Sequence, residues 1–187
     1  MAKQPLIGRV KTRLARDIGH AEALRFFRSA SESLIRRVGR DPRWQTVIAV
    51  SPDRAVHERG IWPDDLPRVG QGEGDLGHRM GSLFRDLPPG PVIIIGADIP
   101  AIGKKQVAAA FDALGRSDTV IGPAEDGGYW LLALNGPAPE GLLDGMRWSH
   151  EETRNDLERQ LSLHGMERVR LLRRLRDVDE ASDLKRG

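Results

Sequence analysis

An aspartate that could bind a cation follows the most apolar stretch of the sequence. Val92 to Ile95 are four consecutive β-branched residues without polar alternation, which predicts a strand buried on both faces. Asp98 comes shortly after this strand. Ligands of open α/β sheets bind at the carboxyl edge, and a carboxylate there can hold a divalent cation against substrate phosphates. The alternative is that Asp98 caps the turn before a helix near Gly103.

A second cluster, which we call the basic cluster, lies near the N-terminus and consists of Gly8, Arg9, Lys11, Thr12 and Arg13. It combines cations, a hydroxyl and a glycine, the composition expected where guanidinium, ammonium and backbone N–H groups surround phosphates. It is not a Walker loop, because no glycine directly precedes the lysine. A basic surface turn without a ligand is the alternative interpretation.

A glycine-rich segment over residues 71–80 leads into a predicted helix. It contains Gln71, Gly72, Asp75 and Arg79. Glycines let a backbone approach a ligand closely, and the N–H groups at a helix N-terminus favour an anion or the polar edge of a base. This segment is therefore a candidate binding site for part of a nucleotide.

Another candidate carboxylate, that of Asp126, follows a second predicted strand. Asp126, Gly127 and Gly128 belong to the loop that follows the strand predicted over residues 119–121, and Asp126 would lie near Asp98 if both strands end at one sheet edge. Such a carboxylate could share a metal ion or orient an attacking hydroxyl. The alternative is a hairpin turn with Asp-Gly chemistry.

A D-x-D pattern at residues 177–179 follows the last predicted strand, where helix capping is the favoured interpretation and metal binding the alternative.

The elements that must position these residues alternate between helix and strand. Apolar spacing predicts helices over residues 21–38, 75–84 and 104–114, a helix opened by a Ser149/Glu152 capping box and ending near 163, and strands over 44–50, 92–95, 119–121, 129–134 and 169–172. No repeat or linker interrupts the pattern. We therefore expect a single domain over residues 1–187, a three-layer α/β/α fold with a mostly parallel sheet.

Composition excludes several classes of protein. The 187 residues contain no cysteine, which excludes disulfides, thiolate zinc sites and cysteine nucleophiles. Lysine and arginine total 29 against 27 acidic residues and are interspersed with them, unlike the patches of nucleic-acid-binding proteins. No apolar run approaches the ~20 residues of a membrane span, and residues 1–15 lack a signal peptide's apolar segment. We expect a cytoplasmic protein without a nucleic-acid partner.

Together the clusters resemble a bacterial family of glycosyltransferase-like proteins with the GT-A, or nucleotide-diphospho-sugar transferase, fold. Its members are encoded near radical-SAM genes and are often described as arsenosugar-biosynthesis glycosyltransferases. More distantly, the chain is similar to the guanylyltransferases for 2-phospholactate and for molybdenum cofactor. The matching motifs are K-x-P-x-x-G-x-V-K-T-R-L-A at residues 3–15, Q-G-x-G-D-L-G-x-R-M at 71–80, G-A-D-I-P at 96–100, G-P-A-x-D-G-G-Y-W at 122–130, W-S at 148–149 and D-V-D-x-x-x-D-L at 177–184.

The resemblance implies a metal-dependent transferase that takes a nucleotide sugar or a nucleoside triphosphate as donor and a small molecule as acceptor. Asp98 would bind Mg²⁺ or Mn²⁺, and the basic cluster would bind the donor's diphosphate, with Lys11 neutralising charge on the leaving group. The glycine-rich segment would face the nucleobase or ribose. Asp126, with Gly127 and Gly128, would border the acceptor and serve as a base or second metal ligand.

Two alternatives to sugar transfer remain open at this point. A nucleotidyltransferase would use the same residues to join a nucleoside monophosphate to a phosphorylated acceptor, with release of pyrophosphate. A non-catalytic protein would bind a nucleotide sugar without turning it over. Both share the donor site with the glycosyltransferase and differ from it in the product.

The start of the chain departs from the family pattern. Family members begin with an apolar strand directly before K-x-P, whereas only Met1 and Ala2 precede Lys3 here. We expect the first strand to be missing or truncated, with the natural start upstream and Met1 an internal residue of that strand. Alternatively, neighbouring strands close the gap, or another chain fills it, as in a homo-oligomer.

Overall fold

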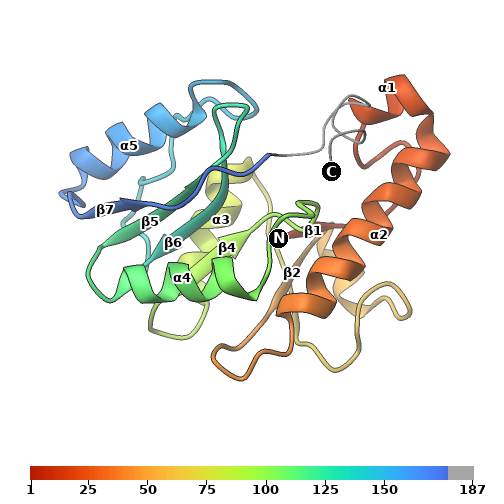
Figure 1. Ribbon diagram of the computed structural model, residues 1–187, viewed down its shortest axis with the longest axis horizontal. Helices are drawn as coiled ribbons and strands as arrows, with labels where there is room; N and C mark the ends of the chain where they lie inside the picture. The colour runs from red at the N-terminus through yellow and green to blue at the C-terminus, as the bar shows by residue number, and fades with distance from the viewer. Residues whose placement is uncertain (177–187) are drawn as a thin grey trace. The chain divides into compact units, whose positions relative to one another are not determined.

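The computed structural model describes residues 1–176, which divide into two compact units (Figure 1). The first unit comprises residues 1–70 and 96–104, and the second comprises residues 71–95 and 105–176. Both units combine helices with strands, which confirms the predicted α/β class. Three of the five pairs between named strands are parallel and two are antiparallel, so the mostly parallel pairing is also confirmed.

The first unit is built on a parallel sheet with the strand order β1-β2-β3. Its elements are β1 (Ala2–Lys3), α1 (Leu14–Ile18), α2 (His20–Val38), β2 (Ile48–Ser51), the 3-10 helix η1 (Asp53–His57) and β3 (Arg68–Gly70). Helix α2 corresponds to the helix predicted over residues 21–38. Strand β1 is only two residues long and places Ala2 opposite Val50 of β2.

The core of the first unit joins the sheet to α2. Its buried members are Ala2, Ile35, Ile48, Val50, Ala55, Trp62, Leu66 and Ala97. Ala97 comes from the segment after the predicted central strand, so that segment packs on the first unit. A smaller buried cluster of Leu14, Ala15 and Ala23 holds α1 against α2.

The strand predicted over residues 44–50 begins later, at Ile48. The Trp44 indole Nε1 donates to the carbonyl oxygen of Val38 (3.0 Å), at the end of α2. The Arg43 guanidinium carbon lies 4.9 Å from the centroid of the Trp44 ring, a cation–π distance. These contacts hold Trp44 against the end of α2, so the residues before Ile48 do not enter the sheet.

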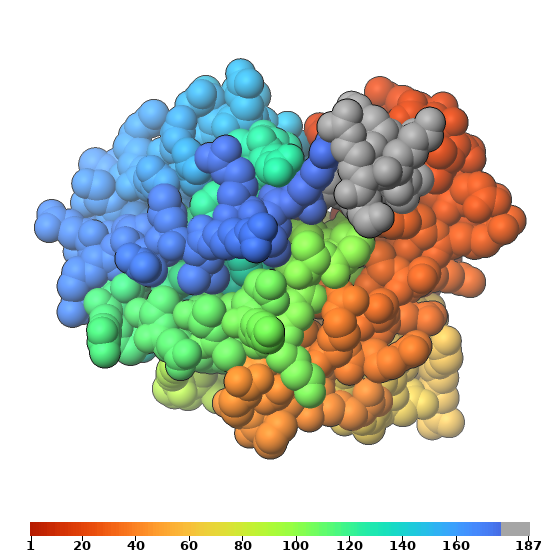
Figure 2. All heavy atoms as spheres, viewed as in Figure 1, coloured from red at the N-terminus to blue at the C-terminus, as the bar shows by residue number. Residues whose placement is uncertain are grey.

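The second unit contains a mixed sheet with the strand order β4-β6-β5-β7. Its elements are α3 (Leu76–Asp86), β4 (Val92–Ile95), α4 (Lys104–Leu114, whose first residue belongs to the first unit), β5 (Thr119–Pro123), β6 (Tyr129–Leu134), α5 (Thr153–Leu163) and β7 (Val169–Leu171). All residues of β5 are buried, and β6 is buried except at its first residue. Strand β7 is one edge of this sheet, with Arg170 and Leu171 exposed, and the blue C-terminal part of the described chain lies on the face that Figure 2 shows.

Strands β5 and β6 form an antiparallel hairpin. Ile121 lies opposite Leu132, and the backbone N–H of Ala124 donates to the carbonyl oxygen of Gly128 (3.0 Å). Of the two readings of residues 126–128, the hairpin turn is therefore present in the structure, while a chemical role stays a prediction. Strand β4 is also antiparallel to β6, so β4 and β5 run in the same direction.

The predicted capping box at Ser149 is wrong. Ser149 has a φ of +55°, whereas an N-cap residue needs an extended backbone, and α5 begins later, at Thr153. Glu152 precedes the helix without a side-chain capping bond. The Thr153 hydroxyl instead lies within hydrogen-bonding distance of the carbonyl oxygens of Arg147 and His150 (2.6 and 2.7 Å).

Candidate functional site

The structure brings Lys11 of the basic cluster beside Asp98 within the first unit. The Lys11 Nζ lies 2.9 Å from Asp98 Oδ2, and the two side chains are 8% and 29% exposed. Lys11 has a φ of +46°, a left-handed conformation that costs an L-residue about 1–2 kcal/mol. The backbone therefore adopts an unfavourable conformation at the residue that pairs with Asp98.

The rest of the basic cluster lies on the surface of the turn between β1 and α1. Gly8 has a φ of +72° with open space where a Cβ would be, and Arg9, Thr12 and Arg13 are exposed. Two buried residues, Val10 and Leu14, fix the turn, because they are 4% and 0% exposed. Exposed cationic residues thus flank Lys11 in the chain, on a turn that is held by its apolar residues.

Asp98 lies in a segment with no regular secondary structure between β4 and α4. Its neighbours Ala97 and Ile99 are 8% and 5% exposed, and Ile102 is fully buried. A single turn is closed within the segment by the Ile102 N–H, which donates to the Ile99 carbonyl oxygen (3.3 Å). The apolar side chains face the protein while the carboxylate keeps partial access to solvent, so Asp98 can accept a ligand.

The glycine-rich segment belongs to the second unit. Asp75 is the N-cap of α3, and its Oδ1 accepts a hydrogen bond from the His78 backbone N–H (2.9 Å). Gln71 is 5% exposed, whereas Gly72 is exposed with a φ of +78° and open space at its Cβ position. Arg79 follows within α3 and is half-buried. Asp75 therefore has a structural role in starting the helix, and the unobstructed Cβ position of Gly72 is where a ligand could approach.

Helix α3 packs closely on the loop that contains the W-S motif. A Cβ on Gly77 would overlap the carbonyl oxygen of Leu143 and would lie 2.9 Å from the Trp148 ring. The Tyr129 ring packs edge-on against Trp148 with centroids 6.4 Å apart, and its hydroxyl reaches the Met80 sulfur (3.8 Å). Burial raises the pKa of the Tyr129 phenol well above its usual value. Three motifs of the sequence thus meet around Trp148 and Tyr129.

The Asp126 turn packs on the same loop from β5 and β6. Asp126 is exposed, and its Oδ1 accepts a hydrogen bond from the Gly128 backbone N–H (2.9 Å). Gly127 has a φ of +86°, and a Cβ there would overlap the backbone of Glu151. The Arg154 N–H donates to the Gly127 carbonyl oxygen (3.0 Å). The turn is therefore rigidly attached to the start of α5.

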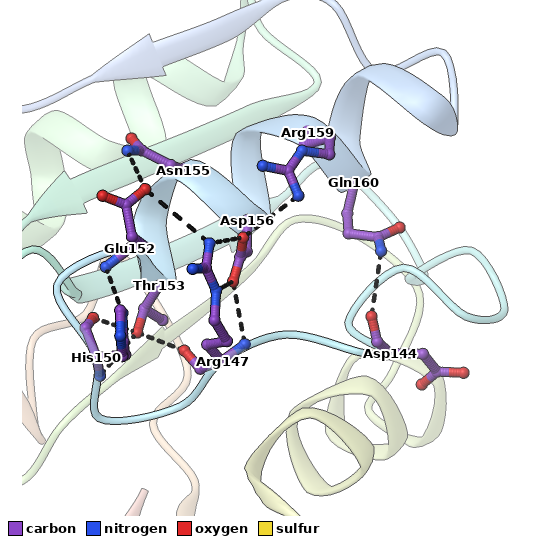
Figure 3. Close-up of polar contacts among 9 residues, drawn as sticks. All are labelled: Asp144, Arg147, His150, Glu152, Thr153, Asn155, Asp156, Arg159 and Gln160. Carbon is purple, nitrogen blue, oxygen red and sulfur yellow. Dashed lines mark hydrogen bonds and ion pairs between the residues drawn. The ribbon is translucent and has the colours of Figure 1, made fainter.

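An ion pair that sequence reasoning missed holds this loop to α5 (Figure 3). Arg147 Nε and Nη2 donate to the two carboxylate oxygens of Asp156 (2.8 and 2.7 Å), and the Arg147 backbone N–H donates as well (3.1 Å). Asp156 is only 5% exposed. The hydrogen bonds from Arg147 hold the pKa of Asp156 well below its usual range. No periodic pattern links residues 147 and 156, so their pairing could be found only from the fold.

The predicted site residues thus fall into two groups. The basic cluster and Asp98 belong to the first unit, while the glycine-rich segment and the Asp126 turn belong to the second. The expected proximity of Asp98 to Asp126 stays a prediction. Within residues 1–176, no three histidine, aspartate or glutamate side chains gather as a ready-made metal site. The D-x-D pattern at residues 177–179 lies outside the described residues.

Comparison with known proteins assigns the chain to a family. Residues 34–150 match DUF2064, a family of uncharacterized proteins conserved in bacteria. The chain belongs to this family. The match includes the Asp98 segment, the glycine-rich segment and the Asp126 turn, and it begins after the basic cluster. No curated protein matches this DUF2064 chain.

A crystal structure from Desulfovibrio desulfuricans is similar to this DUF2064 protein over most of its length. That protein is described as a nucleotide-diphospho-sugar transferase, an assignment that is itself provisional. The two are 26% identical with a TM-score of 0.83, over 95% of this chain and 79% of the other. The comparison confirms the predicted nucleotide-diphospho-sugar transferase fold. In residues 1–176, no helix is both long and apolar enough to cross a membrane.

Proposed function

We propose that this DUF2064 protein is a transferase that uses a nucleotide-activated donor, most simply a nucleotide sugar. The observation that carries the proposal is the pairing of Lys11 with Asp98 at 2.9 Å, in a fold like that of a nucleotide-diphospho-sugar transferase. Transfer from such a donor leaves a phosphate-bearing group whose negative charge must be neutralised. A lysine and a carboxylate side by side are the residue types that bind the phosphate and its cation.

Phosphate binding falls to the basic cluster. Arg9, Lys11 and Arg13 would donate to the diphosphate oxygens, as guanidinium and ammonium groups do, and the Thr12 hydroxyl would add a further donor. Because Lys11 already lies beside Asp98, a phosphate held by Lys11 would be close to a cation held by Asp98. Lys11 would then stabilise the charge that develops on the leaving group.

Asp98 fits one mode of metal binding. Mg²⁺ usually keeps several waters and binds one or two carboxylates together with substrate phosphates, so it needs no preformed cage. A single, 29%-exposed carboxylate beside a phosphate-binding turn suits that mode. Mg²⁺ or Mn²⁺ bound there would neutralise charge on the diphosphate.

The second unit would supply contacts to the rest of the substrates. The unobstructed Cβ position of Gly72, with Gln71 and Arg79 nearby in the chain, would face the nucleobase or ribose. Asp126 would act as the base toward the acceptor's hydroxyl. Its support is that the carboxylate is exposed while Gly128 holds one of its oxygens in place.

The proposal is tested by ligand binding and by product. Nucleotide sugars and nucleoside triphosphates are screened with Mn²⁺ by thermal shift, since a ligand at a hundred times its Kd stabilises by about 2.7 kcal/mol. Asp98→Asn should abolish the metal-dependent part of the binding, whereas Asp86→Asn, at an exposed position of α3, should not change it. Unchanged metal-dependent affinity in Asp98→Asn would refute the role of Asp98. Release of a nucleoside diphosphate supports sugar transfer, and release of pyrophosphate would identify nucleotidyl transfer instead.

A further inference from the structure

The segment that contains Asp98 cannot hold its own backbone in place. It runs from residue 96 to residue 103 without helix or strand, so no regular ladder of backbone hydrogen bonds fixes its course. Side chains that donate to its carbonyl groups restrict the course of such a segment.

Arg37 donates to two of these carbonyl groups from the last turn of α2. Its Nη2 donates to the Pro100 carbonyl oxygen (2.7 Å), and its Nε donates to the Ile102 carbonyl oxygen (3.1 Å). The remaining nitrogen, Nη1, donates to the hydroxyl of Ser33 one turn earlier (3.1 Å). Since the guanidinium is planar and rigid, these bonds fix the two carbonyl groups relative to α2 and to each other.

Two further contacts lie near the ends of the segment. Ala97 packs in the core of the first unit, which fixes the chain just before Asp98. Lys104 Nζ lies 3.6 Å from a carboxylate oxygen of Asp41; the lysine side chain is 54% exposed and the aspartate side chain 5% exposed, and Arg43 pairs with the same carboxylate. Arg37 thus joins two carbonyl groups of the chain just after Asp98 to α2, while Lys11 contacts the Asp98 carboxylate itself.

We propose that Arg37 is a positioning residue for Asp98. It holds the Pro100 and Ile102 carbonyls so that the Asp98 carboxylate faces Lys11, at the place where the donor's diphosphate and its cation bind. This inference rests on the proposed function of Asp98, and it assigns to α2 a role that no motif of the sequence indicated. Arg37 acts through the backbone of the segment and not by contact with a ligand.

The test compares variants of two adjacent arginines. Arg37→Ala removes the bonds to the segment, while Arg36→Ala removes the same charge from an exposed position of the same helix. Arg37→Lys keeps the charge and the aliphatic stem but loses the planar fork. The probe is inorganic pyrophosphate with Mg²⁺, measured by calorimetry, because it needs no knowledge of the nucleobase. Circular dichroism checks that each variant is folded at the temperature of the measurement.

We expect Arg37→Ala to weaken the Mg²⁺-dependent affinity for pyrophosphate about tenfold, the lower end of what removing an indirect partner of a metal ligand costs. Arg36→Ala should bind like the wild type, and Arg37→Lys should lie between the wild type and Arg37→Ala. If Arg37→Ala is folded and its affinity for pyrophosphate lies within about threefold of that of Arg36→Ala, the proposal is overturned. If Arg37→Ala does not fold, Arg37→Lys decides: affinity equal to that of the wild type overturns the proposal, and weaker affinity supports it.

Asp98→Asn, measured with the same probe, separates this inference from the proposed function. If Asp98→Asn loses the Mg²⁺-dependent affinity and Arg37→Ala does not, only the role of Arg37 is wrong. If Asp98→Asn binds as tightly as the wild type, the proposed function of Asp98 fails and the positioning role fails with it.

Discussion

Replacing Gly127 by alanine tests how closely the β5–β6 turn packs on the loop before α5. Gly127 has a φ of +86°, a region that residues with a Cβ rarely adopt. A Cβ there would lie 2.6 Å from the carbonyl carbon and from the Cα of Glu151, well inside van der Waals contact. The Arg154 N–H donates to the Gly127 carbonyl oxygen, so the two backbones cannot move apart without losing that bond.

The expected cost has two parts. The left-handed conformation costs alanine about 1–2 kcal/mol more than glycine. Forcing a methyl group against backbone atoms costs a further 1–3 kcal/mol or so, as in overpacked cores. Gly127→Ala should therefore lower the free energy of unfolding by about 2–5 kcal/mol, which is a large share of the ~5–15 kcal/mol that a domain has.

Gly145→Ala is the matched control within the same unit. Gly145 also has a positive φ, +66°, but a Cβ there would meet nothing within 4 Å. Gly145→Ala should lower the free energy of unfolding only by the cost of the left-handed conformation, about 1–2 kcal/mol. Urea unfolding followed by circular dichroism measures the free energy of unfolding of both variants. The slope of this free energy against urea concentration shows whether a substitution has changed the denatured state. Equal losses in the two variants would refute the close packing of the turn on Glu151.

Three further predictions concern single side chains. Lys11→Ala and Arg13→Ala should each weaken calorimetric binding of diphosphate-containing ligands by about 1.5–3 kcal/mol and leave a bare nucleoside unaffected, since the lost bonds are to phosphate; equal losses for both ligands would contradict this. Hydrogen bonds from Arg147 lower the pKa of Asp156 in the folded protein. The Asp156 carboxylate therefore stabilises the fold at pH values above its pKa in the unfolded chain, about 4, and this contribution is lost as the pH falls through its lower pKa in the folded protein. The difference in unfolding midpoint between Asp156→Asn and the wild type should accordingly be constant near neutral pH and shrink below about pH 4; a difference that does not depend on pH would contradict it. Ser149→Gly should raise the free energy of unfolding by about 1 kcal/mol in urea titrations, because glycine adopts a φ of +55° without strain.

Elements defined by local patterns could be predicted from the sequence. The predicted helix over 104–114 and the predicted strand over 92–95 have the same bounds in the structure, and the helix over 21–38 differs from α2 by one residue. Asp75 begins α3 as expected, because capping depends on residues three positions apart. Such features need only the apolar period and the end signals, which neighbouring residues contain.

Features that depend on distant contacts could not be predicted in the same way. The shortening of the strand at Trp44 requires the indole to reach Val38, and the late start of α5 requires a left-handed Ser149. The pairing of Arg147 with Asp156 has no local signal at all. In each case a side chain or backbone contact made by the fold replaced the choice that local propensity favoured.

The candidate site shows the same division. Residue types indicated a carboxylate, a basic cluster and a glycine-rich segment, but only the fold brought Lys11 to Asp98 and Arg37 to the segment beyond it. The order of the motifs along the chain did not reveal that the first two groups belong to one compact unit and the glycine-rich segment to another.

The two groups of predicted site residues differ in how far packing already explains them. Asp75 caps a helix, Asp126 holds a turn and Gly127 avoids an overlap, so the fold requires these residue types whether or not a ligand binds. Lys11 is different, because a left-handed position favours glycine or asparagine, and the lysine there pairs with Asp98. A non-glycine residue in a left-handed conformation motivates a hypothesis of function. The strongest indication of function therefore lies at Lys11 and its partner Asp98, and variants of that pair should affect binding more than they affect folding.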